Sequence, residues 1–199
     1  MEFNIMEEIT GLGIMLLVLL GLIGILLLIG TRVKKKFTAG KRKGWLIAHI
    51  LMVITYFSGM LMTLLLNLLA TSNFCSTNEQ IYTAHLFAKY ADWFMVIPGA
   101  LGCLITGVWL AIRAQGGLTK QRWVLVKVVT AILAVLYGAS LVKFSYSETV
   151  YLSKLFVDTL NYDPAYLQSR SLMLINTYIS LAIMLFMLIV SYMRPWRKK

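Results

Sequence analysis

Acidic side chains are scarce in this sequence, and so are cysteine, histidine and proline. The 199 residues include 8 Asp and Glu, 2 Cys, 2 His and 3 Pro, and only 14% of the residues are charged. So few charges, together with 59% hydrophobic residues and a mean hydropathy of +0.78, exclude a soluble domain. The sequence therefore predicts an integral membrane protein with several apolar spans of about 20 residues each.

The rare residues also exclude several kinds of site. Cys75 is predicted in a polar loop and Cys103 deep in an apolar segment, so the two cysteines define no disulfide framework and no metal-ligand spacing. The chain has no Gly-rich phosphate loop, no zinc pattern, no nucleophile elbow and no pair of carboxylates inside an apolar span. Phosphate binding, zinc catalysis and serine hydrolysis are therefore not predicted.

The net charge of +11 comes from basic residues that gather in three places. On a soluble protein such a charge would indicate nucleic acid. The clusters are Arg32, Lys34, Lys35, Lys36, Lys41, Arg42 and Lys43; Arg113, Lys120 and Arg122; and Arg194, Arg197, Lys198 and Lys199. All 8 acidic residues lie elsewhere. Because basic loops remain on the cytoplasmic side, the positive-inside rule explains this partition, and we expect a lipid bilayer as the partner and no nucleic acid.

Five apolar segments are predicted to cross the membrane, which makes the fold an all-α polytopic helix bundle. They are 10–31, 45–69, 90–112, 122–143 and 171–193. With the basic clusters inside, the N-terminus lies outside and the C-terminus in the cytoplasm, as in a multi-pass protein of the plasma (inner) membrane. The division is then an N-terminal helix with its basic loop, 1–44, and a four-helix core, 45–199. A homo-oligomer is left open.

Two outer segments connect the core spans. Segment 70–84 is predicted to be a polar loop. Residues 147–160 have the pattern of an amphipathic helix capped by Ser147, which would lie on the membrane surface. Pro164 is predicted to start the next helix. In the first span, five glycines predict close packing against another helix: Gly11, Gly13, Gly21, Gly24 and Gly30.

His49 and Lys127 are the candidate functional residues. Each lies four positions after a tryptophan that opens a span, Trp45 and Trp123, so the two are predicted at the same depth near the cytoplasmic side. Ionisable groups in a membrane are costly and usually functional. His49 could be an axial haem ligand, a proton-transfer group or a hydrogen-bonded packing residue. Lys127 could pair with an anionic group or extend its ammonium to the inner interface.

The second histidine is predicted on the opposite side of the membrane. His85, Lys89 and Asp92 share one helix face just before Trp93, which marks the outer interface. His85 is therefore expected on a solvated outer face, with a contact between Lys89 and Asp92. On this prediction the two histidines cannot ligate one haem together. The methionines in the spans leave a Cu(I) site as an alternative, although Met is also a common core filler.

Four segments carry a family resemblance. Segment 45–61 (WLIAHILMVITYFSGML) resembles the opening helix of HemJ-type membrane protoporphyrinogen oxidases and of CopD-like copper-resistance membrane proteins. Segment 98–110 (PGALGCLITGVWL) resembles the returning helix of HemJ-type proteins, and 123–127 (WVLVK) their Trp-led helix with a functional Lys. The close, 193–196 (MRPW), is similar to their terminal basic-Pro-aromatic sequence. The likeness covers 45–196 and extends to sister families of integral membrane proteins without known activity.

The resemblance implies a four-helix core that binds b-type haem, or a related porphyrin, and acts in membrane redox or haem metabolism. His49 would be the axial ligand of the iron, and Lys127 the second essential group. Tyr56 would hydrogen-bond within the same pocket and assist catalysis. If the chain is an enzyme, it would be a haem-dependent oxidoreductase similar to HemJ-type protoporphyrinogen oxidases. A CopD-like copper transport or resistance protein and a non-catalytic accessory subunit are the alternatives.

Overall fold

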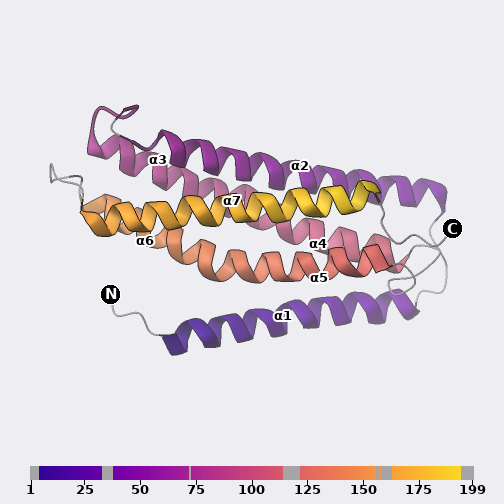
Figure 1. Ribbon diagram of the computed structural model, residues 1–199. Coiled ribbons are helices and arrows are strands. Elements are labelled where there is room, and N and C mark those ends of the chain that lie inside the picture. The colour runs from indigo at the N-terminus through magenta and orange to yellow at the C-terminus, as the bar shows by residue number, and fades with distance from the viewer. Residues whose placement is uncertain are drawn as a thin grey trace. The chain divides into compact units, whose positions relative to one another are not determined.

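The computed structural model of the protein describes residues 5–32, 38–71, 73–113, 122–155, 157 and 163–193. Within these residues all regular elements are helical and no strand occurs, as the all-α prediction requires. In chain order the elements are α1 (Ile5–Arg32), α2 (Ala39–Leu69), α3 (Asn78–Ala91), the π-helical turn η1 (Asp92–Val96), α4 (Ile97–Ile112), α5 (Arg122–Tyr137), the π-helical turn η2 (Gly138–Val142), α6 (Lys143–Leu155) and α7 (Pro164–Met193). Figure 1 shows that α3 continues into α4 and α5 into α6.

Four helices are long and apolar enough to cross a membrane, which identifies a multi-pass membrane protein. They are Ala39–Leu69, Asn78–Ile112, Arg122–Leu155 and Pro164–Met193, and they contain the last four predicted spans. The first predicted span is also helical, as α1, whose described apolar stretch Leu16–Leu28 is shorter than the other four. Whether α1 crosses the membrane stays a prediction.

The loop predicted at 70–84 is too long, because α3 already begins at Asn78. Thr77 caps this helix: its side chain accepts a hydrogen bond from the backbone N–H of Gln80, at 3.3 Å. The Gln80 side chain in turn accepts from the backbone N–H of Ser76, at 2.7 Å. Thr and Gln three residues apart are typical of a capping box, so the sequence does carry the signal for this start.

The surface helix predicted at 147–160 is wrong as a separate element. Residues 147–155 form the end of α6, which continues α5 without a break because no proline interrupts 122–155. Ser147, the predicted cap, therefore lies inside a helix. A buried face of α6 packs along α3, and its members are Ser145, Tyr146, Thr149, Val150 and Ser153. Residues 156 and 158–160 lie outside the described residues.

The start of α7 and the η1 turn both follow from proline. α7 begins at Pro164, as predicted, and the preceding Asp163 carboxylate accepts a hydrogen bond from Ala165 N–H at 2.9 Å. Pro98 lies in the first turn of α4, where an ordinary α-helix would bring its ring against the carbonyl of residue 94. The π-helical turn η1 precedes it and contains residue 94, so the helix adjusts its winding at that carbonyl instead of ending.

The chain divides into two compact units. Unit 1 consists of Met1–Val53, Ala100–Ser140 and Leu185–Lys199, and unit 2 consists of Ile54–Gly99 and Leu141–Met184. The core of unit 1 forms where α1 packs on α4 and α5, with Leu19, Leu104 and Val108 at most 3% exposed. The core of unit 2 includes Ala70, Ile81 and Tyr166.

The glycines of α1 differ from the prediction. A Cβ added at Gly13, Gly21 or Gly24 would meet no atom within 4 Å. These three glycines therefore do not bring α1 close to a neighbouring helix, and the predicted close packing is wrong at these positions. Leucine and isoleucine side chains hold α1 in unit 1 instead, because Leu19 and Ile23 are its buried residues. The surroundings of Gly11 and Gly30 lie outside the described part of the structure.

Candidate functional site

His49 lies in the first half of α2, within unit 1, and two residues of α4 fix its ring. The Nδ1 atom is 2.8 Å from the hydroxyl oxygen of Thr106. Thr106 donates its own hydrogen to the carbonyl of Gly102, at 2.6 Å. Because a hydroxyl has one hydrogen, Thr106 accepts from His49, and Nδ1 carries the proton in the neutral imidazole. Nε2 then keeps its lone pair, and it has no hydrogen-bond partner among the described residues.

Gly107 provides the space for this ring. A Cβ at Gly107 would lie 3.2 Å from the Cε1 atom of His49, which is tighter than an ordinary contact. The imidazole therefore packs directly on the α4 backbone, one residue beyond Thr106. This backbone contact and the Thr106 hydrogen bond together hold the ring in its position.

Lys127 belongs to the same unit and is anchored by α7. Its ammonium donates a hydrogen bond to the Ser191 hydroxyl at 3.0 Å. It also lies near enough to His49 and to the Cys103 thiol for electrostatic interaction with both. His49 and Lys127 therefore belong to one unit and interact electrostatically, and their common depth in a membrane stays a prediction. An ammonium has three hydrogens, so Lys127 retains donors beyond the bond to Ser191.

Aromatic side chains surround the start of α2 and the end of α4. The rings of Trp45 and Trp109 have centroids 6.0 Å apart, and the Arg113 guanidinium lies 5.6 Å from the centre of the Trp109 ring. The two rings are tilted by 51° relative to each other. Tryptophans beside a cation are typical of a membrane–water interface. His49 lies about one helical turn beyond Trp45, which is consistent with a position just inside that interface.

Tyr56, the third predicted site residue, lies in unit 2. It is 9% exposed, and its backbone packs closely against Gly99 of α4. A Cβ at Gly99 would lie 2.7 Å from the Tyr56 backbone nitrogen, so α2 and α4 touch there through backbone atoms. The role of Tyr56 in the same pocket as His49 stays a prediction.

None of the known protein families, curated proteins or solved structures compared with this chain matches it. The function must therefore be inferred from the chemistry of its own side chains. In unit 1 that chemistry is a neutral imidazole with a free lone pair on Nε2, beside an ammonium with unused donors. Such a pair can ligate a soft or borderline metal ion and neutralise an adjacent carboxylate.

A second polar centre, in unit 2, was not predicted. His85 is 0% exposed, so the expectation of a solvated outer face is wrong. Its Nδ1 lies 3.0 Å from Asn67 Oδ1, and its Nε2 lies 2.9 Å from the Tyr166 hydroxyl. Asn67 Nδ2 donates to the Tyr146 hydroxyl at 3.1 Å, and Tyr146 lies 3.2 Å from Thr177 Oγ1. All five side chains are at most 3% exposed.

Charged groups at the edge of this centre also form hydrogen bonds or a contact with an aromatic ring. Arg170 donates to the backbone carbonyl of Asn67 at 3.1 Å, near the C-terminal end of α2. Ser169 joins Thr149, at 2.9 Å, to the Glu148 carboxylate, at 3.5 Å. The Lys89 ammonium lies 5.5 Å from the centre of the Trp93 ring, in place of the contact with Asp92 that was predicted.

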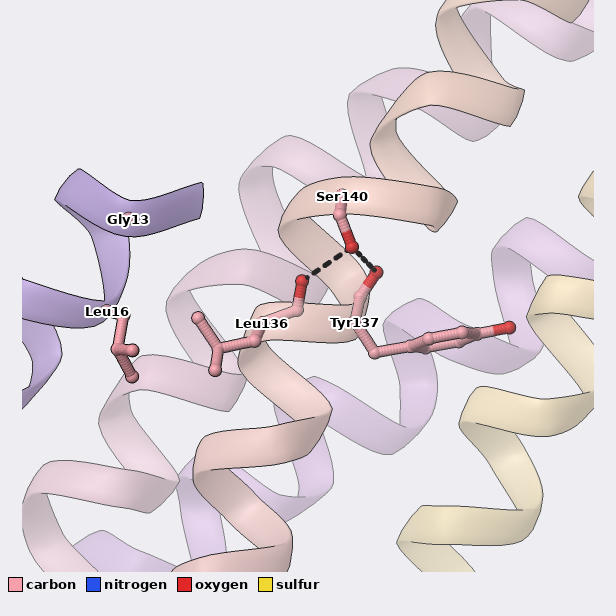
Figure 2. Close-up of a pocket in the computed structure, with 5 residues that line it drawn as sticks. All are labelled: Gly13, Leu16, Leu136, Tyr137 and Ser140. Atoms are coloured by element: carbon pink, nitrogen blue, oxygen red, sulfur yellow. Dashed lines mark hydrogen bonds between the residues drawn. The ribbon is translucent and has the colours of Figure 1, made fainter. Parts of the chain in front are cut away.

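An apolar groove of about 290 Å³ lies between α1 and the end of α5. Figure 2 shows Leu16 and Leu136 pointing toward each other across it, while the ring of Tyr137 points away from α1. The hydroxyl group of Ser140, which also lines the groove, donates to the carbonyls of Leu136 and Tyr137, at 2.9 and 3.3 Å. The groove contains neither His49 nor Lys127, so it adds no reactive group to the site.

Proposed function

We propose that this protein is a five-span protein of the plasma (inner) membrane that binds b-type haem through His49. The N-terminus lies outside and the C-terminus in the cytoplasm, so that His49 and Lys127 lie toward the cytoplasmic side. The protein acts in membrane redox or haem metabolism. The observation that carries the proposal is the orientation of His49, whose Nδ1 donates to Thr106 and whose Nε2 lone pair is available.

The residues around His49 fit such a group. Histidines that ligate metals donate their other ring N–H to a neighbouring acceptor, which holds the ring in position and raises its basicity. Thr106 supplies that acceptor, and Gly107 supplies the space for the ring. A haem iron commonly takes an imidazole nitrogen as its axial ligand. His49 would provide that nitrogen.

Lys127 fits the acidic edge of the same group. Haem carries two propionates, and an ammonium beside the ligating histidine would neutralise one of them. The Ser191 hydroxyl holds the Lys127 ammonium in unit 1, which lowers the entropy lost on pairing. Bound haem would supply one-electron chemistry, and the chain would orient it and keep water from its axial face. The resemblance to HemJ-type proteins implies that a porphyrinogen would be oxidised at this site and that Tyr56 would assist the reaction.

One observation favours a CopD-like copper protein as the second candidate. The Met52 thioether, one turn after His49 on α2, packs on Gly102 of α4, next to Cys103. Thioether, thiol and imidazole are the ligands that Cu(I) prefers. Within the described residues, however, no group of three or more His, Cys, Asp and Glu could hold a metal ion. A copper site would therefore depend on methionine.

The two histidines provide a matched test. The full chain is expressed with haem supplementation, purified in mild detergent, and its absorption recorded before and after reduction with dithionite. We expect a Soret band and sharp reduced α and β bands in the wild type and in His85→Gln, and their loss in His49→Gln. A featureless wild-type spectrum, or full retention of haem in His49→Gln, would exclude the proposal. Copper bound stoichiometrically and lost in Met52→Leu would support the second candidate.

A further inference from the structure

The buried polar centre of unit 2 has a single direction of hydrogen bonding. Thr177 donates its hydrogen to the Met173 carbonyl at 2.8 Å, and Thr63, which also bonds to Tyr146, donates to the Met60 carbonyl at 2.9 Å, so both hydroxyls are left to accept from Tyr146. Tyr146, having donated its hydrogen, accepts from the Asn67 amide NH₂. The amide oxygen of Asn67 then accepts from His85 Nδ1–H. With the Asn67 amide oriented so that Nδ2 faces Tyr146 and Oδ1 faces His85, the donors follow one order, because a hydroxyl has one hydrogen and an amide has distinct donor and acceptor ends.

This direction determines the state of His85. With its proton on Nδ1, the neutral ring has a lone pair on Nε2, and the Tyr166 hydroxyl donates to it at 2.9 Å. The order of donation is Tyr166 to His85, then Asn67, Tyr146, Thr177 and the Met173 carbonyl. A proton cannot pass through the Asn67 amide as it passes through hydroxyls and imidazoles, so the chain is not a conduit. Nε2 is the position where the network can take up a proton.

We propose that His85 is a reversible proton-binding site, and that protonation at Nε2 displaces the Tyr166 O–H···N bond and loosens the contact of α3 with α7. The cation formed would have to donate from Nε2, so the Tyr166 hydroxyl would have to turn away. The packed elements present further charged or titratable groups: Tyr146 and Glu148 from α6, and Tyr166 and Arg170 from α7, with Lys89 and Asp92 on the same helix. Arg170 interacts electrostatically with His85, and Asn67 is the neutral neighbour from α2.

Loss of stability at acid pH follows from linkage. An imidazole in an unfolded segment binds a proton at about pH 6.5 without breaking any tertiary contact. In the folded unit the same proton costs the Tyr166 hydrogen bond and adds a cation near Arg170. The unfolded chain therefore binds more protons below that pH, and stability falls as the pH falls. The contribution of His85 to the stability of unit 2 would thus be lost at acid pH.

The direct test is nitrogen NMR on the full-length chain in detergent, labelled with ¹⁵N-histidine. The sequence has 2 His, so His49→Gln leaves His85 as the only signal. At pH 7.5 we expect a neutral ring protonated on Nδ1, which takes up a proton reversibly as the pH is lowered. In Tyr166→Phe the neutral form loses its donor, so the midpoint should move toward neutral pH. A ring protonated on Nε2, or an unchanged midpoint in Tyr166→Phe, would overturn the proposal.

Thermal unfolding tests the consequence. Between pH 8 and pH 5 the unfolding temperature of His49→Gln should fall by roughly 2–8 °C, which corresponds to the loss of one buried hydrogen bond. His49→Gln/His85→Gln should lose most of this dependence, because the introduced glutamine can accept from Tyr166 but does not titrate. If the two proteins have the same pH dependence, His85 is not the site. If the double variant does not fold, the NMR titration of Tyr166→Phe decides the question alone.

Discussion

Residue by residue, the two histidines share one feature: in each, Nδ1 donates to a side-chain oxygen of another helix. They differ at Nε2. In His85 this atom accepts from Tyr166, whereas in His49 it has no hydrogen-bond partner among the described residues. A lone pair that is oriented but unused suits a ligand, while one that is already bonded suits an internal network. The difference at a single atom therefore separates a candidate cofactor site from a candidate proton site.

Thr106→Val tests the orienting role of the hydroxyl. The methyl group keeps the shape of the side chain, but His49 Nδ1 loses its acceptor. We expect haem affinity to fall by roughly 10–100-fold, as when the hydrogen-bond partner of a ligating histidine is removed. Titration of the apoprotein with haem measures this loss. Thr149→Val, at a buried threonine of unit 2, is the matched control and should retain wild-type affinity. Equal losses in both variants would show a general effect on folding.

Sequence reasoning misplaced one of these histidines, His85. For the other, the Trp45-to-His49 and Trp123-to-Lys127 spacings are local, so helix rise alone was enough to predict His49 and Lys127 at one depth, and the two interact electrostatically. The burial of His85 depends on Asn67 and Tyr166, which are 18 and 81 residues away in the chain. No local pattern gives such partners, and a histidine near Lys89 and Asp92 looks like a solvated face.

At the scale of the helices, the length of a helix depends on whether the sequence contains residues that end it. Hydropathy predicted the apolar part of every span, but it could not show that α3 and α6 extend two of them. The polar residues of these extensions do not end a helix. Several of them are buried in unit 2 and bond to side chains of α2 and α7. A proline did not end one either, since Pro98 is accommodated by η1. The polar residues 78–84 and 147–155 were therefore wrongly predicted to form part of a loop and a separate surface helix.

Also at the scale of the helices, Gly99 and Gly21 differ in the space that an added Cβ would have. Gly99→Ala places a Cβ 2.7 Å from the Tyr56 backbone, which side-chain motion cannot relieve, so α2 and α4 must separate. We expect a loss of about 1–3 kcal/mol in unfolding free energy. Gly21→Ala meets nothing within 4 Å and should stabilise α1 by about 0.5–1 kcal/mol through helix propensity. Unfolding in mild detergent with increasing denaturant measures both. A tolerated Gly99→Ala would contradict the close approach.

Over the residues that the structure describes, the molecule is a helical membrane protein, and each of its two units contains a polar centre. Neither centre contains a full set of metal ligands from His, Cys, Asp and Glu within the described residues. The basic clusters predict which ends of the helices face the cytoplasm, and this orientation determines the side on which each centre would exchange its ligand. On that prediction, the end of α2 that carries His49 faces the cytoplasm.

The two free cysteines test that orientation. Cys75 lies between α2 and α3, and Cys103 lies within α4. With the N-terminus outside, a membrane-impermeant maleimide added to intact cells should label the wild-type chain at Cys75. Cys75→Ser should abolish the labelling, whereas Cys103→Ser should not change it. Labelling of Cys75 only after the cells are permeabilised would show the opposite orientation and would place His85 toward the cytoplasm.

The order of hydrogen-bond donors in unit 2 limits which substitutions the sequence can accept. A leucine that faces lipid can be exchanged for another apolar residue without regard to its neighbours. A single change among Tyr166, His85, Asn67, Tyr146 and Thr177 is costly unless the new side chain keeps the donor or acceptor that its neighbour needs. Accepted substitutions at these five positions should therefore arise as matched pairs, so that covariation across related chains would record the direction of the network.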